Sequence, residues 1–565
     1  MTGPTPRTGK TAHPGTPAPT GTGRSGEPLV RVEGLTVSFG TGSHRTRPVR
    51  GVSFTVPRGR IVAIVGESGS GKSLTARSLV GLAGDGADVA ATTLRFDGTD
   101  LDRLRPNGWR ALRGRRIGLV LQDALGSLDP LRRIGDEVAE PLREHRTVPP
   151  ARREAEVLRL LAECGVPEPS LRARQYAHEL SGGLRQRALI ASALAAGPDL
   201  LIADEPTTAL DATVQRQVLE LLRERASAGT GVLLISHDLG AVAEFADDIH
   251  VMRDGRFVEQ GPAADVLENP THPYTKTLVA AVPGGGGRTG GPADDARTVL
   301  RAERLAKRYR LPGRAVLTAV ENVSLTVRAG ETLGIVGESG SGKTTVGRML
   351  MGLVAPDEGR VELDGANWAD LRGPARRAAR RRVQMVYQHP LGSFDPRYTA
   401  RQLLEEPLRA VRVPRGEREQ RLTALLGHVG LSTEVLARRA RDLSGGQRQR
   451  LAIARALAPG PDVIVCDEPV SALDAAVQAQ VLDVLVEVQE RLGVAYVFIS
   501  HDLGVVRGLS HRVLVMKDGR LLESGSAEQI FDAPEHPYTR ELLNAVPRMR
   551  ATGTEAGSKA PLKRL

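Results

Sequence analysis

Two glycine-rich segments carry the clearest chemical signal in the sequence. Both follow the pattern G-x-x-x-x-G-K-[ST], and each lies between an apolar segment and a helical one. In such a loop the backbone N–H groups cradle phosphate, the lysine adds positive charge, and the hydroxyl that follows it binds Mg²⁺. One copy could be a chance glycine turn, but two copies in one chain predict two phosphate sites. The residues expected to contact phosphate are Gly66, Ser68, Gly69, Ser70, Gly71 and Lys72 in the first loop and Gly337, Ser339, Gly340, Ser341, Gly342 and Lys343 in the second, and the expected magnesium ligands there are Ser73 and Thr344.

An acidic pair follows a short apolar segment in each half of the chain. The pairs are Asp204 with Glu205 and Asp467 with Glu468. An aspartate at the end of a strand can reach Mg²⁺, directly or through water, beside a triphosphate. The glutamate that follows is well placed to orient and deprotonate an attacking water, which is a general-base role. Alone, such a pair could simply end a strand before a proline, but behind two phosphate loops it predicts catalysis.

Two further kinds of polar residue follow apolar segments. His237 and His501 close the next predicted strand in each half, and each could hydrogen-bond the γ-phosphate. Gln122 and Gln388 follow another apolar segment and can meet magnesium or water through an uncharged amide. Taken singly, such a histidine is more often a core or cap residue, and such a glutamine is only a polar strand end.

These motifs recur in the same order 263 to 271 residues later, which predicts two similar domains. Residues 283–292 between the copies are rich in glycine and proline, a composition typical of a flexible connector. The expected division is a disordered tail at 1–28, a first domain at 29–282, a linker at 283–297, a second domain at 298–547 and a basic disordered tail at 548–565.

The elements around the motifs predict an α/β fold. A continuous apolar strand at 61–65 or 333–336 runs into each phosphate loop, which opens a helix at 73–80 or 344–351. Strands that alternate with helices imply a parallel sheet, whose binding sites gather at the carboxyl ends of the strands. The polar motifs lie at those ends. Further helices are expected at 186–196 and 449–458, and further strands at 117–121, 200–203, 232–235 and 383–387.

Composition excludes several classes of protein. The net charge is +11, but the terminal segments 1–28 and 548–565 carry over half of it, and only 3% of residues are aromatic, so nucleic-acid binding is not expected. No apolar stretch approaches the roughly 18 residues of a membrane span, and the N-terminal residues do not resemble a secretory signal. The chain is expected to stay in the cytoplasm. Cys164 and Cys466 cannot supply a four-thiolate metal site and are expected in the core.

Together these motifs make the chain resemble the nucleotide-binding component of an ATP-binding cassette transporter, with two cassettes fused in one polypeptide. The resemblance implies tandem P-loop ATPase domains, each with a mainly parallel sheet core, an antiparallel β-subdomain and a helical subdomain. It implies ATP and Mg²⁺ as ligands, intramolecular pairing of the two domains, and two integral-membrane permease subunits that dock near the glutamines. It also implies a peripheral location on the cytoplasmic face of the membrane and an extracytoplasmic substrate-binding protein.

The resemblance assigns further residues to the nucleotide sites. In the family, a Ser-Gly-Gly signature of one cassette reaches the ATP of the other, although a lone Ser-Gly-Gly could be a mere helix cap. The family has glutamine after the signature, and Leu184 departs from this, so we expect modest asymmetry. Asp211 and Asp474 resemble the loop that links the two sites. Phe39 and Tyr309 match the aromatic that stacks on adenine, with strand packing as the alternative. The signature residues are Ser181, Gly182 and Gly183 for the site of Lys343, and Ser444, Gly445, Gly446 and Gln447 for the site of Lys72.

Two repeated segments resemble the dipeptide and oligopeptide importer branch, which also includes nickel and some glycoside systems. One is Gly-Ser-Leu-Asp-Pro at 126–130 or Gly-Ser-Phe-Asp-Pro at 392–396, and the other is His-Pro-Tyr-Thr at 272–275 and 536–539. The latter could also be simple turns that pack a tail. A competing class is the soluble tandem cassette protein that acts on ribosomes or DNA. Such proteins carry a long charged linker, zinc cysteines or coiled-coil insertions, which this sequence lacks.

Overall fold

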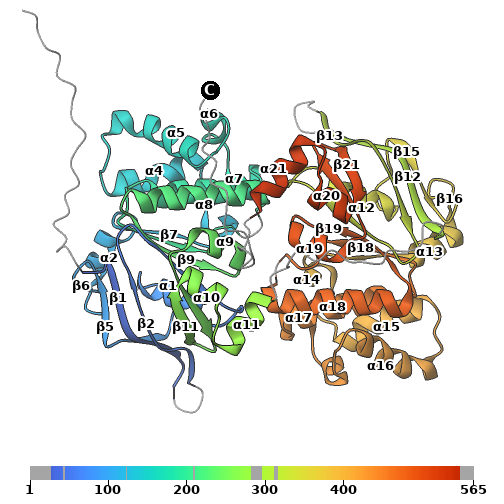
Figure 1. Ribbon diagram of the computed structural model, residues 1–565, viewed down its shortest axis with the longest axis horizontal. Coiled ribbons are helices and arrows are strands. Elements are labelled where there is room, and N and C mark those ends of the chain that lie inside the picture. The colour runs from blue at the N-terminus through green and yellow to red at the C-terminus, as the bar shows by residue number, and fades with distance from the viewer. Residues whose placement is uncertain are drawn as a thin grey trace, which may run out of the picture.

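A computed structural model describes residues 27–41, 45–122, 124–207, 210–280, 296–310, 316–471 and 473–546. These residues form two halves with nearly the same order of elements (Figure 1). The predicted tails and linker lie outside the described residues, apart from residues 27–28 and 296–297 at their edges.

Each half is built on a six-stranded sheet whose strands are parallel except at one edge. In the first half the strand order is β11-β10-β3-β9-β8-β7, and in the second it is β17-β18-β19-β14-β20-β21. The strands of the first half are β3 (Ile61–Val65), β7 (Ile117–Val120), β8 (Leu200–Asp204), β9 (Gly231–Ser236), β10 (Asp248–Arg253) and β11 (Arg256–Pro262). Those of the second half are β14 (Thr332–Val336), β17 (Val383–Val386), β18 (Val463–Asp467), β19 (Ala495–Ile499), β20 (Arg512–Lys517) and β21 (Arg520–Ser526).

The central strands have continuous apolar sequences because both faces of the sheet are covered. Every residue of β3, β8 and β9 is buried, and so is every residue of β14, β18 and β19. On one face, each sheet shares a core with helices, and on the other it packs with an antiparallel sheet. Cys164 and Cys466 are free and buried in these cores, as predicted.

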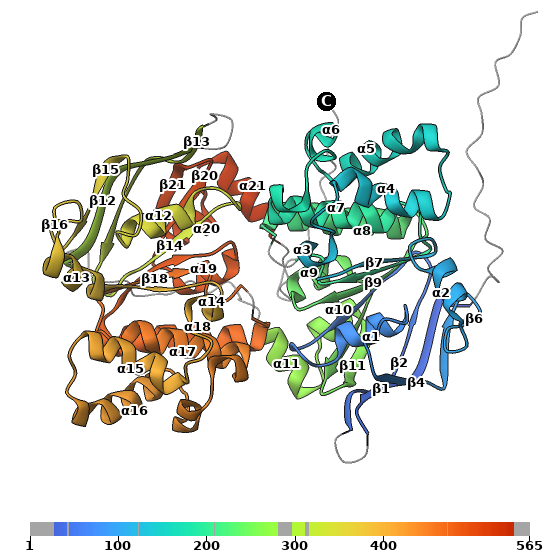
Figure 2. The ribbon, with the colours of Figure 1, turned by 180° about the vertical axis from the view of Figure 1, so that it is seen from behind.

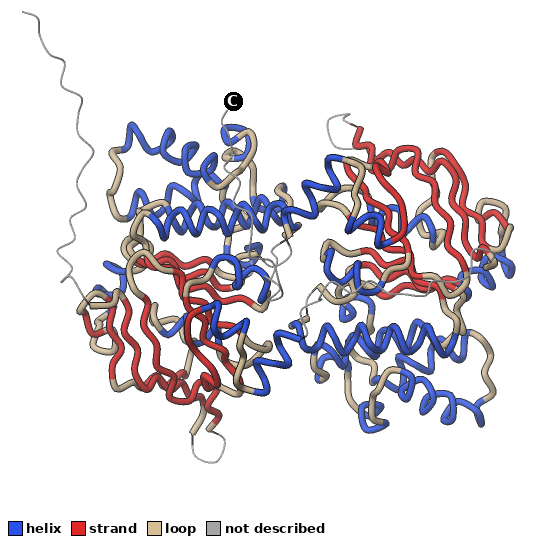
Figure 3. Tube along the Cα trace, viewed as in Figure 1, coloured by secondary structure: helices blue, strands red, loops and turns tan. Residues whose placement is uncertain are grey.

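The antiparallel sheet of each half lies beside the parallel one. Its strands in the first half are β1 (Val30–Phe39), β2 (Thr46–Val56), β4 (Ala87–Ala90), β5 (Thr93–Phe96) and β6 (Thr99–Asp100). In the second half they are β12 (Thr298–Arg310), β13 (Val316–Arg328), β15 (Glu358–Leu363) and β16 (Ala366–Asn367). Figure 3 shows both antiparallel sheets at the outer ends of the molecule.

The helices fall into three groups. A helical subdomain in each half consists of α4 (Ile134–Glu144), α5 (Arg153–Glu163) and α6 (Pro169–Arg172), or of α15 (Ala400–Ala410) and α16 (Arg418–His428). The helices near the phosphate loops and between strands are α1 (Lys72–Ser78), α2 (Pro106–Leu112), α7 (Gly182–Leu194), α8 (Ala212–Ser227) and α9 (Leu239–Phe245), with α12 (Lys343–Leu350), α13 (Gly373–Arg382), α17 (Gly445–Leu457), α18 (Ala475–Leu492) and α19 (Leu503–Leu509) as their counterparts. The last helices of each half are α10 (Ala263–Glu268) and α11 (Pro273–Ala280), or α20 (Ala527–Asp532) and α21 (Pro537–Ala545).

The helices predicted at 186–196 and 449–458 begin earlier than expected. The structure has α7 starting at Gly182 and α17 at Gly445. The reason is local: the hydroxyls of Ser181 and Ser444 accept hydrogen bonds from the backbone of Leu184 and Gln447, so each serine caps its helix. Two glycines in the first turn hid this helix from a prediction based on propensity.

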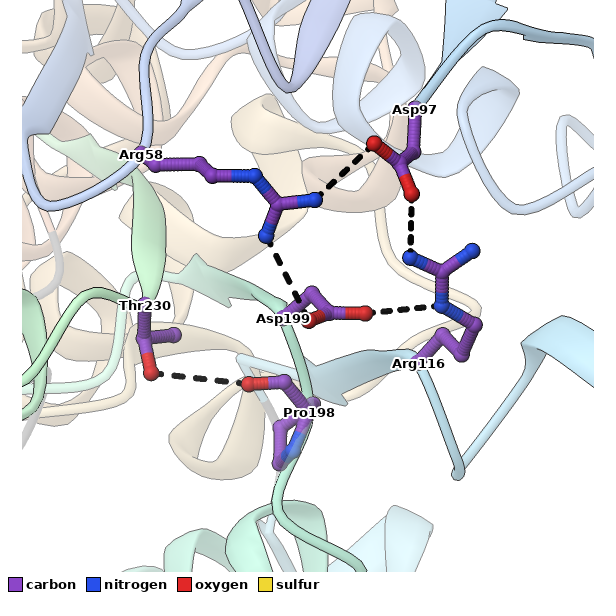
Figure 4. Close-up of polar contacts among 6 residues, drawn as sticks. All are labelled: Arg58, Asp97, Arg116, Pro198, Asp199 and Thr230. Carbon is purple, nitrogen blue, oxygen red and sulfur yellow. Dashed lines mark hydrogen bonds and ion pairs between the residues drawn. The ribbon is translucent and has the colours of Figure 1, made fainter. Parts of the chain in front are cut away.

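Four charges fasten the antiparallel sheet of the first half to the amino-terminal edge of its parallel sheet (Figure 4). Arg116 lies 2.6 Å from Asp97 and 2.7 Å from Asp199. Arg58 lies 2.9 Å from Asp97 and 3.4 Å from Asp199, so the four side chains form a closed ring. Arg382 makes the corresponding contact in the second half, with Asp364 and Asp462. The polar motifs lie at the opposite, carboxyl edge of the sheet. The ring of ion pairs therefore stabilises the packing of the two sheets without contacting the site.

The two halves pack against each other in opposite orientations. Figures 1 and 2 both show the helical subdomain of one half on the same side of the molecule as the antiparallel sheet of the other. Helix α21 of the second half contacts α8 of the first, and α11 of the first contacts α18 of the second. None of the helices described is at once long and apolar enough to cross a membrane.

Candidate functional site

The lysine of each phosphate loop hydrogen-bonds to the backbone of its own loop. The ammonium of Lys72 donates to the carbonyls of Gly66 and Glu67 at 2.8 and 2.7 Å, and Lys343 makes the same two bonds in the second loop. The lysines are almost fully buried, and burial lowers their pKa, while nearby carboxylates oppose that shift. Each loop therefore presents one cation at its centre, where a phosphate would sit.

Glycine is required at the entry of each loop for two reasons. Gly66 has φ 146°, and a side chain there would approach the carbonyl oxygen of Met252 to 2.1 Å. Gly337 has φ 149° and meets Met516 in the same way. The loop thus packs directly on the backbone at the end of the neighbouring strand β10 or β20.

The expected magnesium ligands lie next to each other in both halves. Ser73 Oγ donates to Asp204 Oδ1 at 2.7 Å, and Thr344 Oγ1 donates to Asp467 Oδ1 at 3.0 Å. The second oxygen of Asp204 is buried and accepts no hydrogen bond from the described residues; the Arg77 guanidinium lies 3.5 Å from it. Burial raises the pKa of both aspartates. A hydroxyl and a carboxylate with a spare oxygen are the hard donors that Mg²⁺ prefers, so the residues fit this ion.

The predicted catalytic glutamates sit in a strained but well-supported position. Glu205 and Glu468 both have φ 50°, in the left-handed region that few non-glycine residues adopt. Their backbone N–H groups donate to Ile235 at 3.0 Å and to Ile499 at 2.9 Å, so each strand ladder continues one residue beyond the aspartate. The turn brings the glutamate carboxylate to the carboxyl edge of the sheet.

The predicted glutamine and histidine converge on each glutamate. Gln122 donates to Glu205 Oε2 at 2.8 Å, and Gln388 donates to Glu468 Oε2 at the same distance. His237 Nδ1 lies 3.4 Å from Glu205, and His501 Nδ1 lies 3.1 Å from Glu468. The structure therefore brings together three side chains that lie far apart in the sequence.

The glutamate and histidine of the second half shift each other's pKa. Burial alone would raise the pKa of Glu468, but the hydrogen bond from His501 and its positive charge lower it. Burial alone would lower the pKa of His501, but the Glu468 carboxylate raises it. The pKa of His237 is raised in the same way by Glu205, against the effect of burial. A carboxylate that stays ionised at neutral pH can accept a proton from water.

The first two residues of each signature lie exposed at the start of α7 and α17, whereas Gly183 is half-buried and Gly446 is buried. Ser181, Gly182, Ser444 and Gly445 are all exposed to solvent. In the second half, Gln447 Oε1 also accepts a hydrogen bond from the backbone of Ser444 at 3.1 Å, which completes a capping box. Leu184 cannot make this bond and instead packs against the core. The two signatures thus differ in how their helix starts are capped, and the asymmetry between the two sites stays a prediction.

Electrostatic interactions and one hydrogen bond connect each phosphate loop to the start of α8 or α18 in the opposite half. The Asp211 carboxylate, at the N-cap of α8, opposes the effect of burial on the pKa of Lys343 in the other half. Asp474 has the same influence on Lys72. Thr213 Oγ1 of the first half donates to Glu338 Oε1 in the second phosphate loop at 3.3 Å. The electrostatic effect thus acts from each half on the loop lysine of the opposite half, and the hydrogen bond runs from the first half to the second loop.

A cavity of about 200 Å³ lies where the two sites face each other. Residues from both halves line it, among them Glu205, His237, Val470 and His501. Glu205 and the two histidines, which come from both halves, therefore border one shared space.

The two predicted adenine-stacking residues occupy the ends of β1 and β12. Phe39 is half-buried and packs against the core, as the strand-packing alternative predicts. Tyr309 is half-buried too, and the Lys307 ammonium lies 5.8 Å from the centre of its ring. Both residues are thus partly exposed to solvent.

Three residues in these contacts were not predicted from the sequence. Arg77 lies beside Asp204, and Thr213 reaches the opposite phosphate loop. The third is Tyr274, whose hydroxyl accepts a hydrogen bond from the backbone of Glu67 at 2.9 Å. The repeated His-Pro-Tyr segment marks this tyrosine in the sequence, but the sequence alone does not show that the tyrosine contacts the phosphate loop.

Comparison with known families gives two matches in each half. Residues 49–208 and 320–471 match the family described as ABC transporter. Residues 258–302 and 522–564 match the family described as oligopeptide/dipeptide transporter, C-terminal region.

Curated relatives match nearly the whole chain. The oligopeptide transport ATP-binding protein OppD of Mycobacterium tuberculosis is 40% identical over 606 residues, covering 92% of this chain and 98% of its own. The glutathione import ATP-binding protein GsiA of Pectobacterium atrosepticum is 41% identical, covering 92% of this chain and 89% of its own. The peptidoglycan transport ATP-binding protein YejF of Agrobacterium fabrum is 42% identical, covering 94% and 99%.

Among solved structures, an archaeal ribosome recycling factor, aABCE1, in complex with the ribosomal stalk protein aP1 has a TM-score of 0.59 at 22% identity. The match covers 86% of this chain and 90% of the other. At that identity the likeness shows a common tandem fold and nothing about function.

Proposed function

The chain belongs to the ABC transporter family, and on that basis we propose that it is the ATP-hydrolysing subunit of an importer that takes up dipeptides or oligopeptides through separate permease subunits. The observation that carries the peptide assignment is the oligopeptide/dipeptide transporter C-terminal region, which matches once in each half. The names of the relatives, which cover oligopeptide, glutathione and peptidoglycan transport, support the same class of cargo.

Hydrolysis is assigned to the glutamate of each half. Its carboxylate orients the attacking water and accepts its proton, while Gln122 or Gln388 fixes the carboxylate through the bond at 2.8 Å. The histidine beside it, His237 or His501, carries a raised pKa and can donate to the γ-phosphate. The loop lysines Lys72 and Lys343 bind the β- and γ-phosphates.

The magnesium ligands in this proposal are Ser73 with Asp204 and Thr344 with Asp467, with Gln122 and Gln388 beside them. A bound Mg²⁺ would neutralise charge on the phosphate oxygens during transfer. Phe39 and Tyr309 supply the stacking surface for adenine.

Two ATP molecules join the halves in this mechanism. The signature of each half, led by Ser181 or Ser444, presents its exposed helix start to the phosphates bound by the opposite loop. The hydrogen bond from Thr213 to Glu338 in the second loop has the direction that this pairing requires, and the Asp211 carboxylate acts electrostatically on Lys343 in the same direction. Hydrolysis removes the γ-phosphate bridge, and the halves separate.

The permeases are proposed to dock beside the glutamines. The segments that follow Gln122 and Gln388 form α3 (Ala124–Ser127) and α14 (Pro390–Ser393). Leu391 in α14 and Leu131, which lies beyond the end of α3, are exposed apolar side chains. Motion of the glutamine on hydrolysis would reach such a partner directly. The chain would then work as a peripheral protein on the cytoplasmic face of the membrane, in a complex that also includes an extracytoplasmic binding protein.

Transport by the reconstituted complex tests the proposal. The chain would be combined in vesicles with permeases and a binding protein encoded beside it, and uptake of labelled di- and oligopeptides, nickel chelates and glycosides would be compared. Peptide uptake that requires ATP is the expected result. Uptake of nickel or glycosides alone would move the chain to another system of the same branch, and co-purification with ribosomes but no permease would contradict the transport role.

A further inference from the structure

The His-Pro-Tyr segments place a buried tyrosine against each phosphate loop. Tyr274 accepts a hydrogen bond from the backbone N–H of Glu67 at 2.9 Å, and Tyr538 accepts one from Glu338 at 3.3 Å. Both tyrosines are about 95% buried, since their exposed fractions are 4% and 5%. Glu67 and Glu338 each follow the first glycine of their loop, so the bond fixes the entry of the loop among the residues expected to bind phosphate.

Each tyrosine is itself fixed from two directions. In the first half, Glu259 of β11 accepts hydrogen bonds from the backbone of Thr271 and His272 at 2.7 and 3.1 Å, which anchors the turn that carries Tyr274. A cation covers the ring: the guanidinium of Arg253 lies 4.9 Å from its centre.

The second half repeats the arrangement with different residues. Glu523 of β21 accepts from the backbone of Glu535 and His536 at 2.7 and 3.2 Å, and the ammonium of Lys517 lies 4.3 Å from the ring of Tyr538. Burial raises the pKa of both phenols, to about 12 for Tyr274, so they remain neutral hydrogen-bonding groups. Both halves thus have a glutamate that accepts from the turn, a cation over the tyrosine ring, and a bond from the loop to the tyrosine hydroxyl. If the His-Pro-Tyr turn only packed the end of the chain, there would be no reason for all three to recur.

We infer that Tyr274 and Tyr538 are positioning residues of the ATP sites, each holding its phosphate loop in the phosphate-binding shape through the N–H of the second loop residue. This inference rests on the proposed function and assigns a role to the C-terminal region within each nucleotide site. The tyrosines touch neither ATP nor water in this assignment; they act through the loop.

The helix that contains each tyrosine, α11 or α21, also contacts a helix of the opposite half. Helix α21, which begins one residue before Tyr538, contacts α8 of the first half, and Arg216 of α8 donates to the carbonyl of Asn544 at 3.3 Å. The first turn of α8 also supplies Thr213, which binds the Glu338 side chain. Glu338 is thus held at its backbone by its own half and at its carboxylate by the other.

The test compares single hydroxyl deletions in the full-length chain. Tyr538→Phe and Tyr274→Phe keep the ring and its cation contact but leave the loop N–H without its acceptor. Binding of a fluorescent ATP analogue with Mg²⁺, ATPase kinetics and thermal unfolding would be measured for each. The control is Tyr496→Phe, which removes another buried hydroxyl, bonded to the Leu485 carbonyl at 3.0 Å in the same half as Tyr538.

Loss of one buried hydrogen bond is expected to weaken ATP binding by roughly three- to tenfold at the affected site. Because the loop contacts phosphate before and during the reaction, KM should rise while kcat changes little. Tyr496→Phe should lower the unfolding temperature without changing KM.

Two results would overturn the inference: an affinity of both loop variants within twofold of the wild type, or an equal rise of KM in Tyr496→Phe. A wild-type chain that binds no ATP would instead contradict the proposed function itself, and this inference with it.

Discussion

At the scale of single residues, the two predicted catalytic glutamates depend on an unusual backbone conformation to direct their carboxylates to the edge of the sheet. Each occupies a left-handed backbone conformation, which costs a non-glycine residue about 1–3 kcal/mol. The strand hydrogen bond to Ile235 or Ile499 and the side-chain bond from the glutamine hold it there. Strain is thus stored at the position where the proposed chemistry takes place.

Replacing both glutamates by glutamine should separate binding from hydrolysis. The double variant Glu205→Gln, Glu468→Gln keeps the shape and hydrogen-bonding size of the side chain but removes its basicity. Steady-state ATPase activity should fall by about 100-fold or more, while ATP affinity remains within a few-fold of the wild type. Normal turnover in a phosphate-release assay would rule out the general-base role, and Glu154→Gln, exposed on α5 of the helical subdomain, serves as the matched control.

The pairing of His501 with Glu468 predicts a titration. The folded pKa of the histidine lies above its ordinary value of 6.5 because the carboxylate outweighs burial. The pair therefore stabilises the fold fully below pH 6.5 and loses this contribution as pH rises through the folded pKa. NMR of ¹³C-labelled histidine should show the raised pKa, and in Glu468→Gln the His501 signal should titrate at a lower pH. An unchanged titration in that variant would contradict the coupling.

At the scale of elements, the sequence predicted strands and loops better than helix starts. The strands β3, β8 and β9 were predicted because a strand buried on both faces has to be continuously apolar. The start of α7 was missed because the capping serine and two glycines look like a loop without the tertiary context. The convergence of Gln122, His237 and Glu205 followed from the rule for parallel sheets, whereas the contact between Tyr274 and the loop depends on how the last helix folds back, which no local pattern encodes.

The ion-pair ring in Figure 4 predicts a stability effect that depends on pH. Arg116→Met should destabilise the first half by about 1 kcal/mol, less than a fully buried pair would, because its side chain is 34% exposed. The hydrogen bond from Arg116 lowers the pKa of Asp97, so this stabilisation exists above the ordinary pKa of 3.8 and disappears as pH falls through the folded pKa.

Thermal unfolding between pH 7 and pH 3 would therefore show the wild type and Arg116→Met converging in acid. Arg95→Met, which removes the more exposed pair with Asp100, is the control and should change the unfolding temperature little at either pH. A constant difference between wild type and Arg116→Met across that range would mean that lost packing, and not the ion pair, explains the effect.

At the scale of the whole molecule, the two halves are alike in chemistry but differ at their contacts. Thr213 of the first half binds the second phosphate loop, whereas the corresponding residue of the second half is Ala476, which has no hydroxyl and packs against the core of the first half. The signature of the second half has a capping box that the first lacks. Both differences make the site of Lys343 distinct from that of Lys72, while each half keeps the glutamate, histidine and glutamine that we propose act in hydrolysis.

The proposed exchange of signatures between halves predicts which site a signature change damages. Ser181→Glu places a carboxylate at an exposed helix start that would face the triphosphate bound by Lys343, so repulsion should lower nucleotide labelling of the second phosphate loop by about tenfold, with a smaller effect on the first. Ser444→Glu should do the reverse and is the matched control. Photolabelling with an azido-ATP, followed by cleavage at a protease site engineered between residues 283 and 297, would separate the halves and report each site. If Ser181→Glu lowered labelling chiefly in its own half, each half would complete its own pocket, and the coupling of two nucleotides through opposite signatures would have to be abandoned.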